Sequence, residues 1–202
     1  MISPGVRNLH EVVWCPGRWM HSHWWTALDL TKFESIYQQY PSCRFKLDKI
    51  INVRRQLPIN VLPAQLHENN EYVFSRLFKI SAFISALGLV YLGARDALCV
   101  GPMRRALAAV LGEHGCDQLL AMNLKWPEKN NLALAIENLS LVAQIGWQWL
   151  KKDAPRDANT SLLVQTLDIC FTPLPEMDQY HLERTNLNLD PLFLLYKFAR
   201  FL

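Results

Sequence analysis

The sequence predicts a mainly α-helical protein that folds as a compact multi-helix domain. Prolines divide the 202-residue chain into segments, and most segments place apolar residues at the three- and four-residue spacing of amphipathic helices. Half of the residues are apolar and 19% are charged, which is typical of a globular protein with a proper core. We expect one domain over residues 1–202, weakly subdivided near 153–160, with residues 161–202 as a C-terminal extension packed on the helical body.

Three helices and one loop are predicted in the first half of the chain. A helix over residues 26–39 ends before Pro41, and the apolar spacing of residues 46–53 predicts a short second helix. The two prolines of residues 57–63 indicate a loop. Residues 71–94 carry an apolar stripe that widens until the segment is apolar all round, so we expect a long central helix.

A helix hairpin is expected in the middle of the chain. Pro102 fits the first turn of a helix. Gly112 and Gly115 bracket a tight turn, and the helical pattern begins again over residues 116–122.

The last third contains two further helices and one ambiguous segment. Residues 127–152 predict a strong helix, with two lysines at the carboxyl end where the helix dipole favours cations. Residues 161–171 alternate with a period of two but also fit a short helix, which leaves room for a small β element. Pro191 starts a last amphipathic helix.

Charge and cysteine usage narrow the class of protein. The formal net charge of +3 is too small to argue for nucleic acid. The positive charge is concentrated in residues 44–55, which hold five basic residues against one acidic residue, a net +4. Five scattered cysteines and no secretory signal predict reduced thiols and a cytoplasmic location. The uncharged stretch 80–94 is shorter than the roughly twenty residues that a membrane span needs, so we expect no membrane-spanning segment.

Residues 12–25 (VVWCPGRWMHSHWW) crowd a cysteine, two histidines and four tryptophans together. Cys15, His21 and His23 permit three readings: a metal site, a nucleophile with its base, or packing. A structural zinc site would need a fourth ligand, and a cysteine nucleophile needs a base brought close by the fold. The tryptophans favour packing against the core or a partner. Since no glycine-rich phosphate loop is present either, we expect no enzyme, no cofactor and no metal.

Two motifs carry a resemblance to a known family. Residues 14–21 (WCPGRWMH) follow the pattern aromatic-x-Pro-x-x-aromatic-aliphatic-His, with Trp at both aromatic positions and Met before the His. Residues 85–98 (SALGLVYLGARDAL) and 102–112 (PMRRALAAVLG) follow in order, after a Leu-Pro loop at residues 62–63. The stretch 12–122 thereby resembles the SctK family of type III secretion accessory proteins, which includes YscK, OrgA and MxiK.

The resemblance implies a non-enzymatic adaptor of the bacterial injectisome. Such proteins join the cytosolic domain of the inner-membrane ring protein (SctD type) to the pod protein (SctQ type) of the sorting platform, and indirectly to the stator and ATPase. It places the protein in the cytoplasm at the inner membrane. An α-helical secretion chaperone or binding module is the alternative, and a metal or hydrolase site at residues 15–23 is a further one.

Two sets of residues are assigned roles on this basis. We expect basic side chains to meet an acidic partner surface, and these are Arg44, Lys46, Lys49, Arg54, Arg55, Arg104 and Arg105. The family signature is interpreted as structural: Pro16 fixes a turn, Trp14 and Trp19 are buried anchors, and His21 is hydrogen-bonded.

Overall fold

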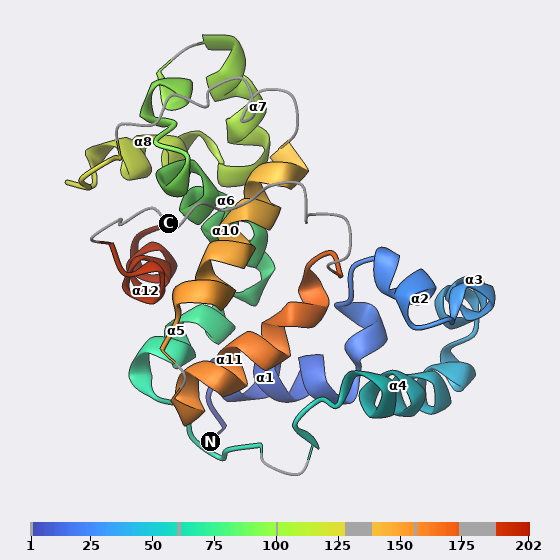
Figure 1. Cartoon of the computed structure of the whole chain (residues 1–202). Helices are drawn as coiled ribbons and strands as arrows, with labels where there is room; N and C mark the ends of the chain where they lie inside the picture. Colours follow the sequence, from blue (N-terminus) through green and yellow to red (C-terminus); the bar gives the residue numbers. More distant parts are fainter. Residues whose placement is uncertain (1, 60–61, 100, 128–138, 156, 174–188) are drawn as a thin grey trace. The chain divides into compact units, whose positions relative to one another are not determined.

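The computed structural model describes residues 2–59, 62–99, 101–127, 139–155, 157–173 and 189–202 (Figure 1). Every regular element among these residues is a helix, and none of them lies in a strand. The mainly α-helical fold class is therefore confirmed. Close contacts group the chain into two compact units, which are described separately: Met1–Ser75 with Arg156–His181, and Arg76–Pro155 with Leu182–Leu202.

The first unit contains six α-helices within its described residues. They are α1 (Pro4–Trp14), α2 (His23–Ala27), α3 (Thr31–Gln39), α4 (Pro41–Arg55), α5 (Glu68–Ser75) and α11 (Ala158–Leu167), with 3-10 turns at Pro16–Arg18 and Asp168–Cys170.

Helices α1 and α5 pack together through apolar and polar contacts. Ser3 caps α1 by accepting from the backbone N–H of Val6. The Ser3 hydroxyl donates in turn to Glu71 of α5 over 2.7 Å, and the Gly5 N–H donates to the other carboxylate oxygen over 2.7 Å. One carboxylate thus serves two donors at the amino-terminal end of α1, where the helix dipole favours negative charge.

The second unit is built around α6 (Ile80–Tyr91), in which only Ser81 is exposed. Around it lie α7 (Gly101–Leu111), α8 (Glu113–Ala121), α10 (Leu139–Asp153) and α12 (Pro191–Phe201), with 3-10 turns at Leu77–Lys79 and Arg95–Leu98. Helices α10 and α12 both pack against α6 (Figure 1). The expected central, buried helix is confirmed in α6.

The structure corrects two predicted helices in the first half of the chain. The single helix expected over residues 71–94 is interrupted, because Arg76 (φ −113°, ψ 32°) leaves the helical region between α5 and a 3-10 turn. The helix expected over residues 26–39 is divided into α2 and α3 by Asp29, which has a positive φ of 54°. The short helix expected at residues 46–53 is longer, since α4 begins at Pro41 and ends at Arg55.

Later elements follow the predictions more closely. Gly112 alone forms the turn between α7 and α8, with a φ of 77°, whereas Gly115 lies inside α8. The ambiguous segment 161–171 is helical, in α11 and the 3-10 turn after it. The helix expected over residues 127–152 is observed from Leu139, and residues 128–138 lie outside the described part of the chain.

No single helix in the described ranges is both long and apolar enough to cross a membrane, and only Glu68–Ser75 and Leu77–Tyr91 taken together across their break reach that length and composition.

Candidate partner-binding surface

The signature segment, residues 14–21, forms a turn that is hydrogen-bonded to α4 and is called the signature turn. Pro16 is buried and opens the 3-10 turn after α1. The Gly17 N–H and the Tyr37 hydroxyl both donate to the same oxygen of Asp48, each over 3.0 Å. A Cβ at position 17 would stand 2.5 Å from the Tyr37 ring, so glycine is required for this close approach. Sequence reasoning missed Asp48 and Tyr37, although a lone acid within a basic helix was a usable signal.

Burial governs the ionisation of this cluster. Desolvation raises the pKa of Asp48, while hydrogen bonds from Gly17 and Tyr37 oppose the shift. Burial and the neighbouring Asp48 raise the pKa of Tyr37. Burial also raises the pKa of Cys15, with Asp48 adding to the effect. An activated cysteine nucleophile needs the opposite shift.

His21 connects the signature turn to the segment after α11. Its backbone N–H donates to the carbonyl of Ile169 over 2.9 Å. Its ring accepts from the backbone N–H of His23 at Nδ1 over 3.3 Å and lies 3.5 Å from the Thr172 hydroxyl at Nε2. Desolvation lowers the pKa of His21. Across the described ranges no three His, Cys, Asp or Glu side chains are grouped so that they could hold a metal ion.

Buried tryptophans anchor this region, but they are not the ones expected. The prediction that Trp14 is a buried anchor is wrong, because its side chain is 57% exposed at the end of α1. Trp19 is half-buried, and its indole N–H has no hydrogen-bond partner within the described chain. Trp24 and Trp25 of α2 are buried instead, and the Trp24 N–H donates to the carbonyl of Phe171 over 2.8 Å.

Two arginines of the basic segment bind backbone carbonyls of their own unit. The Arg44 guanidinium donates to the carbonyls of Tyr37 over 2.9 Å and Gln38 over 3.0 Å, at the carboxyl end of α3. Arg54 donates to the carbonyl of Leu28, at the end of α2. These carbonyls lack intrahelical partners, so the arginines act as helix caps.

Arg55 is committed to a third internal contact. Its guanidinium lies 3.8 Å from the centre of the Trp24 ring and pairs with Asp168 over 2.6 Å. Both partners of the ion pair are mostly buried, with side chains 19% and 21% exposed. Arg44, Arg54 and Arg55 therefore hold the first unit together.

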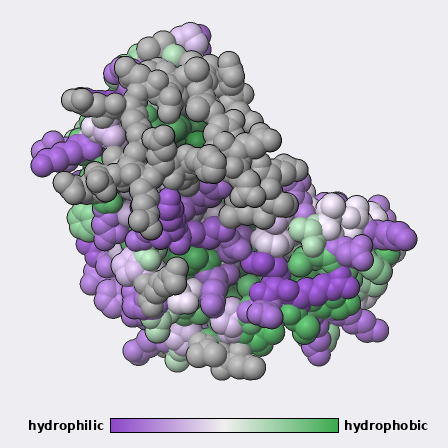
Figure 2. All heavy atoms as spheres, viewed as in Figure 1, coloured by the Kyte–Doolittle hydropathy of each residue, from purple (hydrophilic) through white to green (hydrophobic). Residues whose placement is uncertain are grey.

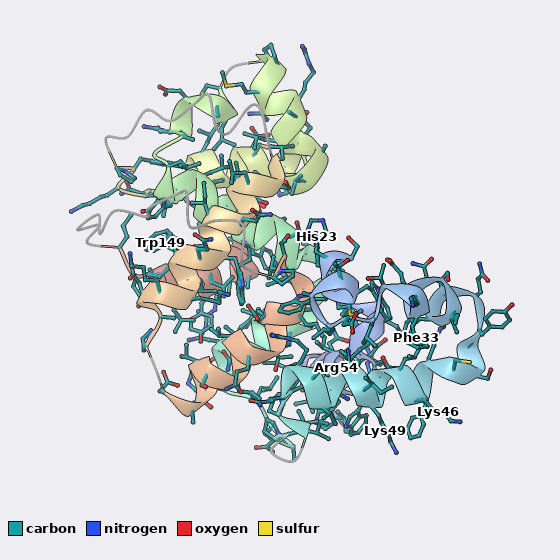
Figure 3. The ribbon with its side chains drawn as sticks, turned by 45° about the vertical axis from the view of Figure 1, so that its right-hand side comes forward. His23, Phe33, Lys46, Lys49, Arg54 and Trp149 are labelled. Carbon is teal, nitrogen blue, oxygen red and sulfur yellow. The ribbon has the colours of Figure 1, made fainter. Side chains whose placement is uncertain are left out.

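Lys46 and Lys49 differ from these arginines because they project outward from α4 (Figure 3). They lie on a face of α4 that also carries exposed apolar side chains; this face, Phe45, Lys46, Lys49, Ile50 and Val53, is named the outer α4 face. In Figure 2, apolar and hydrophilic atoms lie next to each other at the surface over α4.

Arg104 and Arg105 belong to the second unit. Arg104 joins α7 to α8, since its guanidinium donates to Asp117 over 2.7 Å and to Glu113 over 3.2 Å. It also donates to the carbonyl of Leu98, and its acidic partners raise its pKa. Arg105 is exposed. Of the seven basic residues predicted to meet a partner, four are thus occupied by internal contacts.

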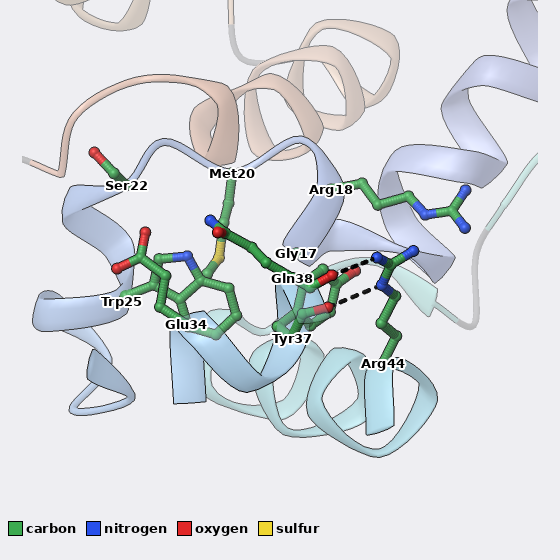
Figure 4. Close-up of a pocket in the computed structure, with 9 residues that line it drawn as sticks. All are labelled: Gly17, Arg18, Met20, Ser22, Trp25, Glu34, Tyr37, Gln38 and Arg44. Atoms are coloured by element: carbon green, nitrogen blue, oxygen red, sulfur yellow. Dashed lines mark hydrogen bonds between the residues drawn. The ribbon is translucent and has the colours of Figure 1, made fainter. Parts of the chain in front are cut away.

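A pocket of about 490 Å³ lies beside the signature turn (Figure 4). Its walls come from the signature segment and from α2, α3 and α4. The lining residues are Gly17, Arg18, Met20, Ser22, Trp25, Glu34, Tyr37, Gln38 and Arg44.

Comparison with protein families bears on the role of these features. The family model described as "Type III secretion system subunit" matches residues 7–169 of the chain. The protein belongs to this family. The matched range contains the signature turn and the outer α4 face of this type III secretion system subunit. No curated protein and no solved structure matches the chain.

Proposed function

We propose that this type III secretion system subunit is a non-enzymatic adaptor of the SctK kind, linking the cytosolic domain of the inner-membrane ring protein to the pod protein of the sorting platform. Through the pod protein it would act indirectly on the stator and ATPase, from the cytosolic face of the inner membrane. The observation that carries the proposal is an exposed apolar and basic face, the outer α4 face, on a member of a type III secretion family.

The chemistry of the signature segment supports an adaptor over an enzyme. Cys15, the only candidate nucleophile of that segment, has a raised pKa and therefore little thiolate at neutral pH. His21 is hydrogen-bonded within the first unit, through its backbone N–H to the carbonyl of Ile169 and through its ring to the backbone N–H of His23. An adaptor needs only a stable helical body with surfaces for two partners.

A bridging experiment tests the proposal. The full chain is mixed with the purified pod protein and with the immobilised cytosolic domain of the ring protein. The proposal expects the pod protein to be retained on the ring domain only when the chain is present. Binding to one partner without bridging contradicts the adaptor role. Co-purification of a secreted effector in place of both apparatus proteins would assign the chain to the chaperones.

A further inference from the structure

The outer α4 face combines apolar side chains with cations in a helical arrangement. Phe45, Lys49 and Val53 follow one another at intervals of four residues, and Lys46 and Ile50 form the adjacent row. The exposed fractions of Phe45, Ile50 and Val53 are 68%, 40% and 75%. The opposite side of the same helix, Leu47, Asp48, Ile51 and Asn52, is buried. Helix α4 therefore carries apolar side chains on both sides, and those of the outer face are exposed.

The charge on this face has one sign. Asp48 is the only acidic residue of α4, and it is 3% exposed and turned toward Gly17 and Tyr37. Lys49 lies 4.4 Å from the centre of the Phe45 ring, which keeps its ammonium next to the apolar stripe. No ion pair to Lys46 or Lys49 is formed by any residue that the structure describes. We propose that the outer α4 face docks an acidic amphipathic helix of another injectisome protein.

The chemistry of the face defines this partner. A stripe of about two and a half turns on a helix is matched by apolar residues at a spacing of three and four on a second helix. Acidic side chains flanking that stripe would lie opposite Lys46 and Lys49, which fixes the register and speeds encounter. The contact is small, because one face of a 15-residue helix buries less than the roughly 1,200 Å² of a stable interface. We therefore expect reversible binding.

A second copy of the chain is a poor occupant. Two copies related by a two-fold axis would apply the same patch to itself, so the four lysines of the two copies would all be brought to one interface. Like charges across an interface oppose association. The inference rests on the proposed adaptor function for the source of the partner, and it adds the surface and the chemistry of the docking segment.

Site-specific cross-linking tests the inference. p-Benzoylphenylalanine replaces Phe45 in the full chain inside secretion-competent bacteria, and the cross-linked peptide is sequenced by mass spectrometry. We expect a segment of an injectisome protein with net negative charge and helical apolar spacing. The matched control places the same residue at Phe33 of α3, which is 42% exposed and should not yield that segment. No cross-link, a second copy of the chain, or a segment that is not acidic would each overturn the inference.

Affinity measurements on the captured segment supply a second readout. The segment is synthesised as a labelled peptide, and its anisotropy is followed with the purified chain. We expect K46E/K49E and F45Q/V53Q each to weaken binding about tenfold or more, with the charge variant losing its effect at high salt. The matched controls K32E and F33Q alter exposed residues of α3, and we expect changes below about twofold. Equal affinity of all variants would contradict the proposal.

The remaining outcomes separate this inference from the adaptor function. Flotation with vesicles of phosphatidylglycerol and phosphatidylcholine that is lost in K46E/K49E, without a protein cross-link at position 45, assigns the face to lipid and overturns the inference. A chain that bridges ring and pod proteins while position 45 captures nothing keeps the adaptor role and loses the docking face. A cross-link to an acidic helix of an injectisome protein in a chain that fails to bridge keeps the face and removes the adaptor role.

Discussion

The crossing of α6 and α10 depends on two glycines, and alanine at either position should destabilise the second unit. A Cβ on Gly88 would stand 1.9 Å from the carbonyl oxygen of Val142, and one on Gly146 would stand 2.1 Å from the carbonyl oxygen of Ile84. In both cases the obstacle is helix backbone, which cannot rotate away as a side chain can. The two helices would have to separate.

The structure sets the size of this effect. Ordinary contact begins at 3.4 Å, so Gly88→Ala requires a separation of about 1.5 Å at the crossing. A gap of that size forfeits much of the dispersion energy between buried side chains, and overpacking of a core costs about 3 kcal/mol at the upper end of its usual range. The higher helix propensity of alanine stabilises the folded state by about 1 kcal/mol and offsets part of this cost. We expect a net loss of about 2 kcal/mol, or about 4–8 °C in melting temperature for a chain of this length.

Urea and thermal unfolding measure this loss directly. Trp147 and Trp149 of α10 are buried, so their fluorescence changes when this helix unfolds, together with that of the other five tryptophans of the chain. Gly115→Ala in α8 is the matched control, because a Cβ there would meet only the side chain of Leu111 in α7, at 3.5 Å. We expect this control to gain about 0.5–1 kcal/mol. A Gly88→Ala variant that unfolds at the wild-type midpoint, or above it, would refute the close backbone approach of α6 and α10.

Three further predictions concern buried and exposed polar groups. Asp48→Asn keeps an acceptor for Gly17 and Tyr37 and removes a buried charge, the burial of which raises the pKa of Asp48, so we expect wild-type or higher stability at neutral pH. Asp48→Ala leaves both donors unpaired, and we expect it to lower the free energy of unfolding in urea by about 2–3 kcal/mol. Arg104→Met breaks ion pairs to carboxylates that are 65% and 63% exposed, and we expect only a small decrease in the urea midpoint, which becomes smaller at high salt because salt screens these pairs. Burial lowers the pKa of His21, so the unfolded chain binds a proton at this residue before the folded chain does as the pH falls. We therefore expect the free energy of unfolding to rise with pH between the folded pKa and about 6.5. A His21→Gln variant in which the free energy of unfolding depends on pH with the same slope would contradict this.

The helical class and the buried character of α6 could be predicted because they follow from local apolar periodicity. The break between α5 and α6 could not, since the apolar pattern continues through it. The residues at the break bind a distant segment: Arg76 donates to the carbonyl of Ala199 over 2.9 Å, and Lys79 donates to the carbonyl of Leu202. Cations here satisfy the carboxyl end of α12, where helix carbonyls lack partners. A contact across 123 positions leaves no local trace in the sequence.

The candidate site shows the same division. Val6, Leu9 and Val13 are the buried side of α1, and this phase turns the next residue, Trp14, toward solvent. That error was avoidable, since the spacing was present in the sequence. The internal roles of Arg44 and Arg54 were not accessible, because the carbonyls that they bind become available only where α3 and α2 end.

The signature turn and the outer α4 face are two sides of one arrangement. Asp48 accepts from Gly17 and thereby fixes which side of α4 faces the core of the first unit. On a helix, residues two positions apart point to nearly opposite sides, so the contact that turns Asp48 inward turns Lys46 outward. We propose that the signature turn acts by setting the rotation of α4. Gly17→Ala should disturb this rotation through the Tyr37 ring without touching any residue of the outer face, and it should weaken partner binding together with K46E/K49E rather than in addition to it.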